Sequence, residues 1–213
     1  MSRLDYQLFY RRHLPHIQPL GATLFITFRL ADSIPAEVLQ RLLEESERVD
    51  RSLERIPDPQ ERRRRAHEEQ RRLFCRWDRA LDTARSGPFW LRDSRVAAIV
   101  TDSLHHLNGR KYDLEAFCIM PNHVHLIYTP LPKPDSSYHA MSAIMHSLKS
   151  YTAQEANQLL GREGAFWQHE SYDHAVRDEP EWRRIVSYVL NNPVAAGLVS
   201  RREDWNWSFS KYS

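Results

Sequence analysis

The stretch from Cys118 to Tyr128 constrains the fold most, because it reads Cys-Ile-Met-Pro-Asn-His-Val-His-Leu-Ile-Tyr and sets two histidines in an apolar run. Pro121-Asn122 is typical of a turn, so the apolar runs on either side are predicted to be two β-strands joined by a tight connection. Alternate side chains of a strand point to opposite faces of the sheet. His123 and His125 are therefore expected on one face, with their imidazoles converging on one point.

Two histidines do not make a metal site, and a pair of this kind in a strand is more often a pair of surface or partly buried side chains. A third oxygen or nitrogen donor has to come from elsewhere in the chain.

Length and composition are those of one globular domain covering residues 1–213, with 41% hydrophobic and 27% charged residues. The two cysteines, Cys75 and Cys118, fall in a predicted helix and a predicted strand, which gives neither a disulfide framework nor zinc-ribbon spacing. No apolar run approaches the roughly 20 residues that span a bilayer. We therefore expect a cytoplasmic protein that does not enter a membrane.

The order of predicted elements indicates an α+β fold. A strand at 23–30 is followed by a helix after Pro35, a break at Pro57-Asp58-Pro59 and a second, arginine-rich helix from about Gln60. Further helices are predicted after Asp93, from Asp135 or Ser136 to Gly161, and from Pro180 to Asn192-Pro193; short strands are predicted at 165–167 and 175–177.

This order predicts a ferredoxin-like antiparallel sheet with helices packed on it. The arginine-rich helical pair, about 34–84, is expected to be an insertion, and residues from about 199 to 213 a C-terminal tail that packs on the domain.

The last helix offers the third donor. Tyr188 and Asn192 are four residues apart, so their side chains share a helical face. An amide oxygen together with two imidazoles makes a mixed site with open positions, which suits Mg²⁺ or Mn²⁺ holding a phosphate oxygen. Tyr188 could then attack the phosphate as a covalent nucleophile, although a helical tyrosine more often only packs.

Two segments together resemble a known family. The run Met120 to Leu126 is similar to the metal motif of the HUH, single-tyrosine transposases of the IS200/IS605 type. Trp167-Gln168, Asp173 to Arg177 and Tyr188 to Val194 are similar to segments of the REP-associated tyrosine transposases of bacteria. The resemblance covers roughly residues 20 to 210.

The resemblance implies a ferredoxin-like fold, a divalent metal on His123, His125 and Asn192, and Tyr188 as nucleophile. The insertion-sequence relatives typically carry glutamine at the third ligand position, so Asn192 favours the REP-associated branch. Tyr151 ranks second as nucleophile, because Glu155 rather than an amide follows it by one turn. Side chains predicted to contact DNA are Lys149, His174, Arg177, Arg184, Arg62, Arg63, Arg64 and Arg65.

The function predicted from these motifs is a metal-dependent endonuclease and transesterase that cleaves and rejoins single-stranded DNA at palindromic hairpins of the REP kind, through a 5′-phosphotyrosine. Two alternatives stay open: a domesticated, non-catalytic nucleic-acid-binding protein of the same fold, and a metal-dependent hydrolase that uses His123, His125 and His174. The sequence leaves the choice between monomer and dimer open.

Overall fold

The computed structural model describes residues 20–84 and 86–212. The chain separates into two compact units, one made of Ile17–Ala31 and Pro88–Ser213 and the other of Asp32–Gly87, as far as these ranges are described. Within the described part of the chain, no helix is long and apolar enough to cross a membrane. The prediction that all 213 residues act as one domain stays a prediction.

The larger unit is built on a five-stranded antiparallel sheet with strand order β4-β1-β3-β2-β5. The strands are β1 (Leu24–Leu30), β2 (Tyr112–Ile119), β3 (His123–Pro130), β4 (Trp167–Ala175) and β5 (Ser208–Ser210). The helices of this unit are α3 (Ser94–Leu107), α4 (Met141–Leu160) and α5 (Glu179–Ala195), with short 3-10 turns at Trp90–Arg92 and Arg202–Asp204. The succession β1-α3-β2-β3-α4-β4 with order 4-1-3-2 is the ferredoxin-like fold, so the predicted fold class is confirmed.

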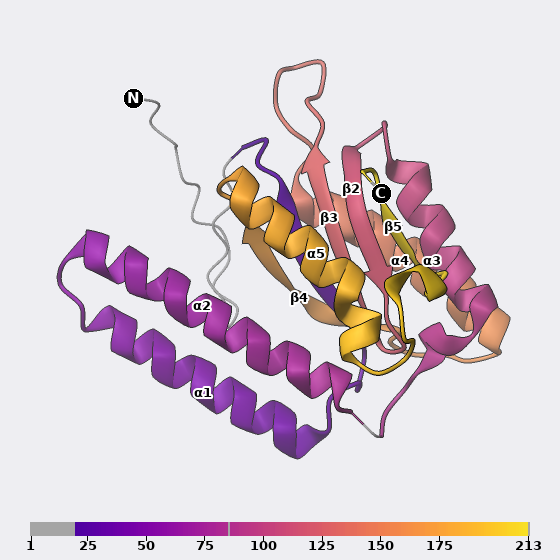
Figure 1. Ribbon diagram of the computed structural model, residues 1–213, viewed down its shortest axis with the longest axis horizontal. Helices are drawn as coiled ribbons and strands as arrows, with labels where there is room; N and C mark the ends of the chain where they lie inside the picture. Colours follow the sequence, from indigo (N-terminus) through magenta and orange to yellow (C-terminus); the bar gives the residue numbers. More distant parts are fainter. Residues whose placement is uncertain (1–19, 85, 213) are drawn as a thin grey trace. The chain divides into compact units, whose positions relative to one another are not determined.

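The sheet has two differently occupied faces. Leu24, Ile26 and Phe28 of β1 join Val124 and Leu126 of β3 in the main hydrophobic core. The buried sides of α3 and α4 complete this core. The other face carries the histidines, and α5 packs there against β2, β3 and β5, in front of the sheet in Figure 1.

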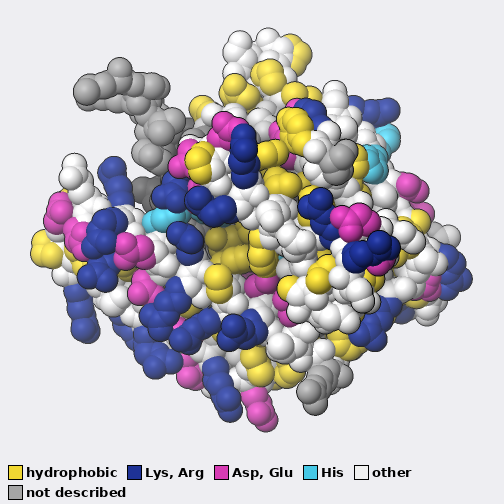
Figure 2. All heavy atoms as spheres, viewed as in Figure 1, with side chains coloured by type: hydrophobic (Ala, Val, Ile, Leu, Met, Phe, Trp, Pro, Cys, Tyr) yellow, Lys and Arg dark blue, Asp and Glu magenta, His cyan; other side chains and the backbone are white. Residues whose placement is uncertain are grey.

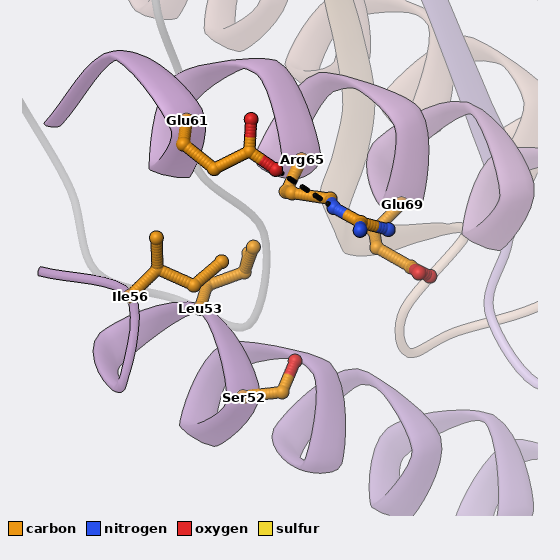
Figure 3. A pocket seen from close by; sticks show the side chains of 6 residues that line it. All are labelled: Ser52, Leu53, Ile56, Glu61, Arg65 and Glu69. Atoms are coloured by element: carbon orange, nitrogen blue, oxygen red, sulfur yellow. Dashed lines mark hydrogen bonds and ion pairs between the residues drawn. The ribbon is translucent and has the colours of Figure 1, made fainter. Parts of the chain in front are cut away.

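The smaller unit is a helical hairpin of α1 (Ala36–Glu54) and α2 (Pro59–Asp82). Asp58 begins α2 by accepting hydrogen bonds from the Gln60 and Glu61 amides, as expected of a helix N-cap. At the end of the hairpin away from this turn, Ile34, Leu42 and Leu81 pack together. Near the turn the helices instead leave a groove of about 300 Å³, which Figure 3 shows, lined by Ser52, Leu53, Ile56, Glu61, Arg65 and Glu69. The region that the sequence marks as an insertion thus lies within a compact unit of its own.

Three boundaries differ from the prediction. α4 begins at Met141 rather than near Asp135, because the Asp135 carboxylate accepts from the amide and hydroxyl of Ser137 and holds a turn there. The two short strands predicted at 165–167 and 175–177 are replaced by one continuous strand, β4. Its many polar residues do not follow the pattern of a predicted strand, but polar side chains are tolerated there because β4 lies at the edge of the sheet.

The third difference lies in α5, which continues to Ala195 with Pro193 inside it. A proline inside a helix lacks the amide that would donate to the residue four before it, and its ring crowds that residue's carbonyl. The last turn still closes, since the Ala196 amide donates to the Asn192 carbonyl at 2.9 Å. The predicted tail also packs as expected: β5 pairs with β2, and the Trp205 indole donates to the Ile119 carbonyl at 3.1 Å. Ser213 lies outside the described residues.

Candidate active site

The two histidines sit side by side on the α5 face of the sheet. His123 and His125 open β3 and are buried, and their rings meet edge to face with centroids 4.7 Å apart. The Nε2 atoms of the two rings are 3.0 Å apart. The convergence expected from strand alternation is therefore present.

Each ring is held from behind through its other nitrogen. The Nδ1 of His123 lies 2.7 Å from the Asn122 Oδ1, and the Nδ1 of His125 lies 2.8 Å from the Thr27 Oγ1. An amide oxygen only accepts, so Nδ1 of His123 carries the proton and donates it, and in the neutral ring Nε2 keeps the lone pair. A threonine hydroxyl can donate or accept, so His125 can take either tautomer. Such outer contacts fix the orientation of metal-binding histidines.

The residues present fit a divalent cation. Two ligand atoms at about 2.1 Å from one metal and at right angles to each other lie about 3.0 Å apart, which is the separation of the two Nε2 atoms. Burial lowers the pKa of His125 to about 3, so this imidazole is neutral at neutral pH, as a metal ligand must be. His123 and His125 could thus hold a metal.

Helix α5 brings Tyr188 to the same place. The Tyr188 ring meets the His125 ring with centroids 5.5 Å apart, and it also meets the edge of Phe25, at 6.2 Å. Phe25 in turn stacks on His125 at 5.8 Å. The phenol is therefore positioned by the same aromatic cluster that surrounds one of the two histidines.

Asn192 follows Tyr188 by one turn and is buried, at 2% exposure. Its Oδ1 has no hydrogen-bond partner among the described residues. Most buried polar atoms are hydrogen-bonded, so an orphaned amide oxygen needs an explanation, and an ion is one of the usual ones. This atom is the best structural support for the third ligand expected from the sequence.

An ionic cluster around the buried carboxylate of Glu181 anchors the start of α5. The Glu181 carboxylate accepts from the backbone amide of Arg177 at 3.0 Å and from its guanidinium at 2.8 and 3.0 Å, and lies 3.3 Å from the Nε2 of His174. Burial acts to raise the pKa of Glu181, but the hydrogen bonds from Arg177 outweigh it and lower the pKa to about 2. Glu181 is therefore ionised, and it ties the end of β4 to the helix that carries Tyr188.

The side chains predicted to contact DNA are in several different settings. His174 and Arg177 are engaged with Glu181. The Lys149 ammonium donates to the Gln168 and His169 carbonyls and to the Ser171 hydroxyl at 2.6–3.2 Å, and burial, followed by the charge of Arg29, lowers its pKa to about 8. Arg184 is exposed. Arg62, Arg63, Arg64 and Arg65 are exposed on α2.

Tyr151, the second candidate nucleophile, lies on α4 and is 54% exposed. The buried residues of α4 belong to the core on the opposite face of the sheet from the histidines. The structure therefore brings Tyr188, and not Tyr151, to the histidine pair.

Two features were missed from the sequence. Thr27 lies opposite His125 in the β1–β3 register, and its position between Phe25 and Arg29 on an alternating strand was the available signal. The inward face of α5 was assigned correctly only in part. The hydrophobic pattern predicts that Trp182, Ile185, Val186 and Val189 are buried; Val189 is, but the other three are only partly buried, whereas Glu181 and Asn192 are buried.

Known proteins are similar to the part of the chain that runs from α3 to α5. Residues 93–192, from the start of α3 to Asn192, match the family model described as transposase IS200 like. This segment is therefore similar to the IS200-like transposases. It contains both histidines and Tyr188, so the family resemblance drawn from the motifs is confirmed.

Two relatives of this IS200-like segment are REP-associated tyrosine transposases. A putative one from Haemophilus influenzae is 30% identical over 105 residues, which are 46% of this chain and 58% of the relative. One from Escherichia coli is 29% identical over 99 residues, 46% of this chain and 54% of the relative. The chain thus spans a little over half the length of these relatives.

A solved structure of a REP-associated tyrosine transposase bound to a REP hairpin has a similar fold. It aligns with a TM-score of 0.52 over 95% of this chain and 82% of that chain, at 19% sequence identity. At this identity the likeness concerns the fold, and it extends beyond the IS200-like segment.

Proposed function

We propose that the protein is a metal-dependent DNA transesterase that cleaves and rejoins single-stranded DNA at REP-like hairpins, with Tyr188 as nucleophile. The observation that carries the proposal is the contact of the Tyr188 ring with His125 beside a pair of Nε2 atoms 3.0 Å apart. The hairpin substrate is inferred from the relatives, which are REP-associated transposases, and from the neighbouring structure, whose protein is bound to a REP hairpin.

In this reaction Tyr188 takes the place of a DNA hydroxyl in the phosphate ester. The Tyr188 oxygen forms a bond to the scissile phosphorus as the bond from phosphorus to the 3′ oxygen breaks. The phenol loses its proton, and the departing 3′ oxygen leaves as a hydroxyl. Rejoining reverses these changes with an incoming 3′-OH, so one phosphate ester replaces another and no external energy source is needed.

His123, His125 and Asn192 would hold the divalent cation, Mg²⁺ or Mn²⁺. When bound, such a cation polarises a phosphate and stabilises the charge that develops on it. The protein contributes the positions of the ligands: Thr27 and Asn122 orient the imidazoles, and the rigid helix α5 fixes the spacing of Tyr188 and Asn192.

The proposal is tested by incubating the protein with Mn²⁺ and single-stranded hairpin DNA that carries unpaired flanks. We expect a denaturation-resistant adduct that contains the DNA 3′ of the cut, together with a released fragment that ends in a 3′-OH. Tyr188→Phe should bind this DNA and give no adduct. Binding without cleavage by the wild-type protein would instead indicate a domesticated binding protein, and cleavage without an adduct a hydrolase.

A further inference from the structure

The helical hairpin carries strongly segregated charge. Helix α1 has six acidic side chains and three arginines, whereas α2 has five acidic side chains and eight arginines. No lysine occurs between residues 32 and 87. Figure 2 shows basic side chains gathered over these two helices. The excess of positive charge belongs to α2.

The arginines of α2 form a continuous exposed stripe. The exposed positions in its middle and C-terminal parts recur at helical spacing, and they are Arg64, Arg65, Glu68, Arg71, Arg72, Cys75, Arg76 and Arg79. The opposite side of the helix holds the buried Leu73 and Leu81. The stripe therefore cannot turn inward, and its charge is presented to the solvent.

The two ends of the stripe are neutralised to different degrees. Near the N-terminus of α2, Arg64 pairs with Glu61 and Glu68, and Arg65 also pairs with Glu61. Further along, the ion pairs found among the described residues involve Arg72 and Arg76 but neither Arg71 nor Arg79, and both of these are exposed. Within the stripe, the arginines without an ion pair therefore lie in the second half of α2.

Between these two arginines, Arg72 and Arg76 are held in place while staying accessible. Glu45 of α1 lies 2.5 Å from the Arg76 guanidinium and 3.8 Å from that of Arg72. The two arginine side chains still keep 50% and 57% of their surface exposed. A pairing of this kind restrains a guanidinium without using all of its five N–H donors. We call Arg71, Arg72, Arg76 and Arg79 the arginine face.

We propose that the arginine face binds the phosphodiester backbone of the DNA on which the protein acts. Residues 71 to 79 rise about 12 Å along a helix, so the four guanidiniums average about one positive charge per 4 Å of helix, close to the one charge per roughly 3.4 Å of a DNA strand. Arginine without lysine favours bidentate phosphate contacts. This inference rests on the proposed function, which identifies the nucleic acid as DNA. The exposed arginines themselves are observed independently of that function.

The test measures binding separately from cleavage. In a Tyr188→Phe background, Arg71→Gln/Arg79→Gln should lower the affinity for a labelled hairpin about tenfold at low salt. The slope of log affinity against log salt concentration should become less steep by about 1.5. The matched control is Arg41→Gln/Arg51→Gln, which removes the same charge from the exposed surface of the acidic helix α1. This control should retain the parent slope within about 0.5.

Because the proposed contacts are to the DNA backbone, Arg71→Gln/Arg79→Gln should lower the affinity for a hairpin of scrambled sequence by the same factor. Equal slopes for the two double variants would overturn the proposal, as would a loss confined to one DNA sequence. A variant that binds DNA normally but sediments as a different oligomer would overturn it too, and would make the arginine face a protein interface. These binding measurements do not depend on adduct formation. If the wild-type protein formed no adduct, the proposed transesterase activity would be wrong, but the proposal for the arginine face would not be affected.

Discussion

The hydroxyl of Thr27 lies 2.8 Å from the Nδ1 of His125, on the side of the ring away from the Nε2 that faces His123. When the Nε2 of His125 binds a metal, its Nδ1 must carry the proton, and Thr27 is then the acceptor for that proton. β1 and β3 pair directly at these two residues. From the neighbouring strand, the threonine can therefore accept the proton that metal binding leaves on the Nδ1 of His125.

Thr27→Val keeps the shape of this side chain and removes the acceptor. We expect the affinity for Mn²⁺, measured by calorimetric titration, to fall about tenfold or more, since outer contacts of this kind have effects of that size. The double variant His123→Ala/His125→Ala should show no binding at the site. Unchanged affinity in Thr27→Val would mean that the hydroxyl does not orient the ligand, and unchanged affinity in the double variant would remove the metal site.

Asn192→Leu should separate stability from metal binding. The Asn192 Oδ1 is buried without a hydrogen-bond partner among the described residues, which costs the metal-free protein about 1 kcal/mol or more. The variant should therefore unfold at higher urea concentration than the wild type when both are metal-free, and it should bind Mn²⁺ more weakly. A variant that is less stable and binds Mn²⁺ as tightly would show that Asn192 serves packing and not the cation.

The two tyrosines provide a matched pair of substitutions. Tyr188→Phe removes only the phenolic oxygen of the ring that meets His125, so adduct formation should disappear while DNA binding and the melting temperature stay near the wild-type values. Tyr151→Phe makes the same chemical change on the other face of the sheet and should retain the adduct. The reverse pattern on a denaturing gel would identify Tyr151 on α4 as the nucleophile instead.

Much of the site could be predicted because it depends on local periodicity. Strand alternation places His123 and His125 together, and a spacing of four residues places Tyr188 and Asn192 on one helical face. Both relations hold within a single element, so they need no knowledge of how the elements pack. The ferredoxin-like succession of strands and helices along the chain follows from the same local signals.

What could not be predicted depends on pairing between distant segments. Thr27 is 98 residues from His125 in sequence, and only the strand register brings them together. For α5, hydrophobicity pointed to Trp182 and Ile185 as the buried side, but Glu181 is buried instead, because Arg177 and His174 arrive from the end of β4 to pair with it. An ionic cluster around a buried carboxylate reverses the usual relation between polarity and burial.

That cluster leads to a prediction about acid stability. Glu181 has a pKa lowered to about 2 in the folded protein, against an ordinary value of 4.5 for a glutamate. A lowered pKa contributes stability above the unfolded pKa, and the contribution is lost as the pH falls through the window from about 4.5 to about 2. Glu181→Gln should therefore reduce the free energy of unfolding by about 2 kcal/mol at pH 7, and the difference from the wild type should shrink as the pH approaches 2.

The neighbouring glutamate supplies the control for this experiment. Glu179 is also in the first turn of α5 and pairs with Arg183 at 2.6 Å, but both side chains are more than 70% exposed. Exposed pairs contribute little, so Glu179→Gln should change the free energy of unfolding by less than about 0.5 kcal/mol. Urea titrations of both variants at pH 7 and pH 3 make the comparison. An equal effect of the two substitutions at pH 7 would show that burial beside Arg177 and His174 gives Glu181 no special role in anchoring α5. A loss that is larger for Glu181→Gln at pH 7 and much reduced at pH 3 is the result expected of a buried, ionised carboxylate that holds the tyrosine-bearing helix to the end of β4.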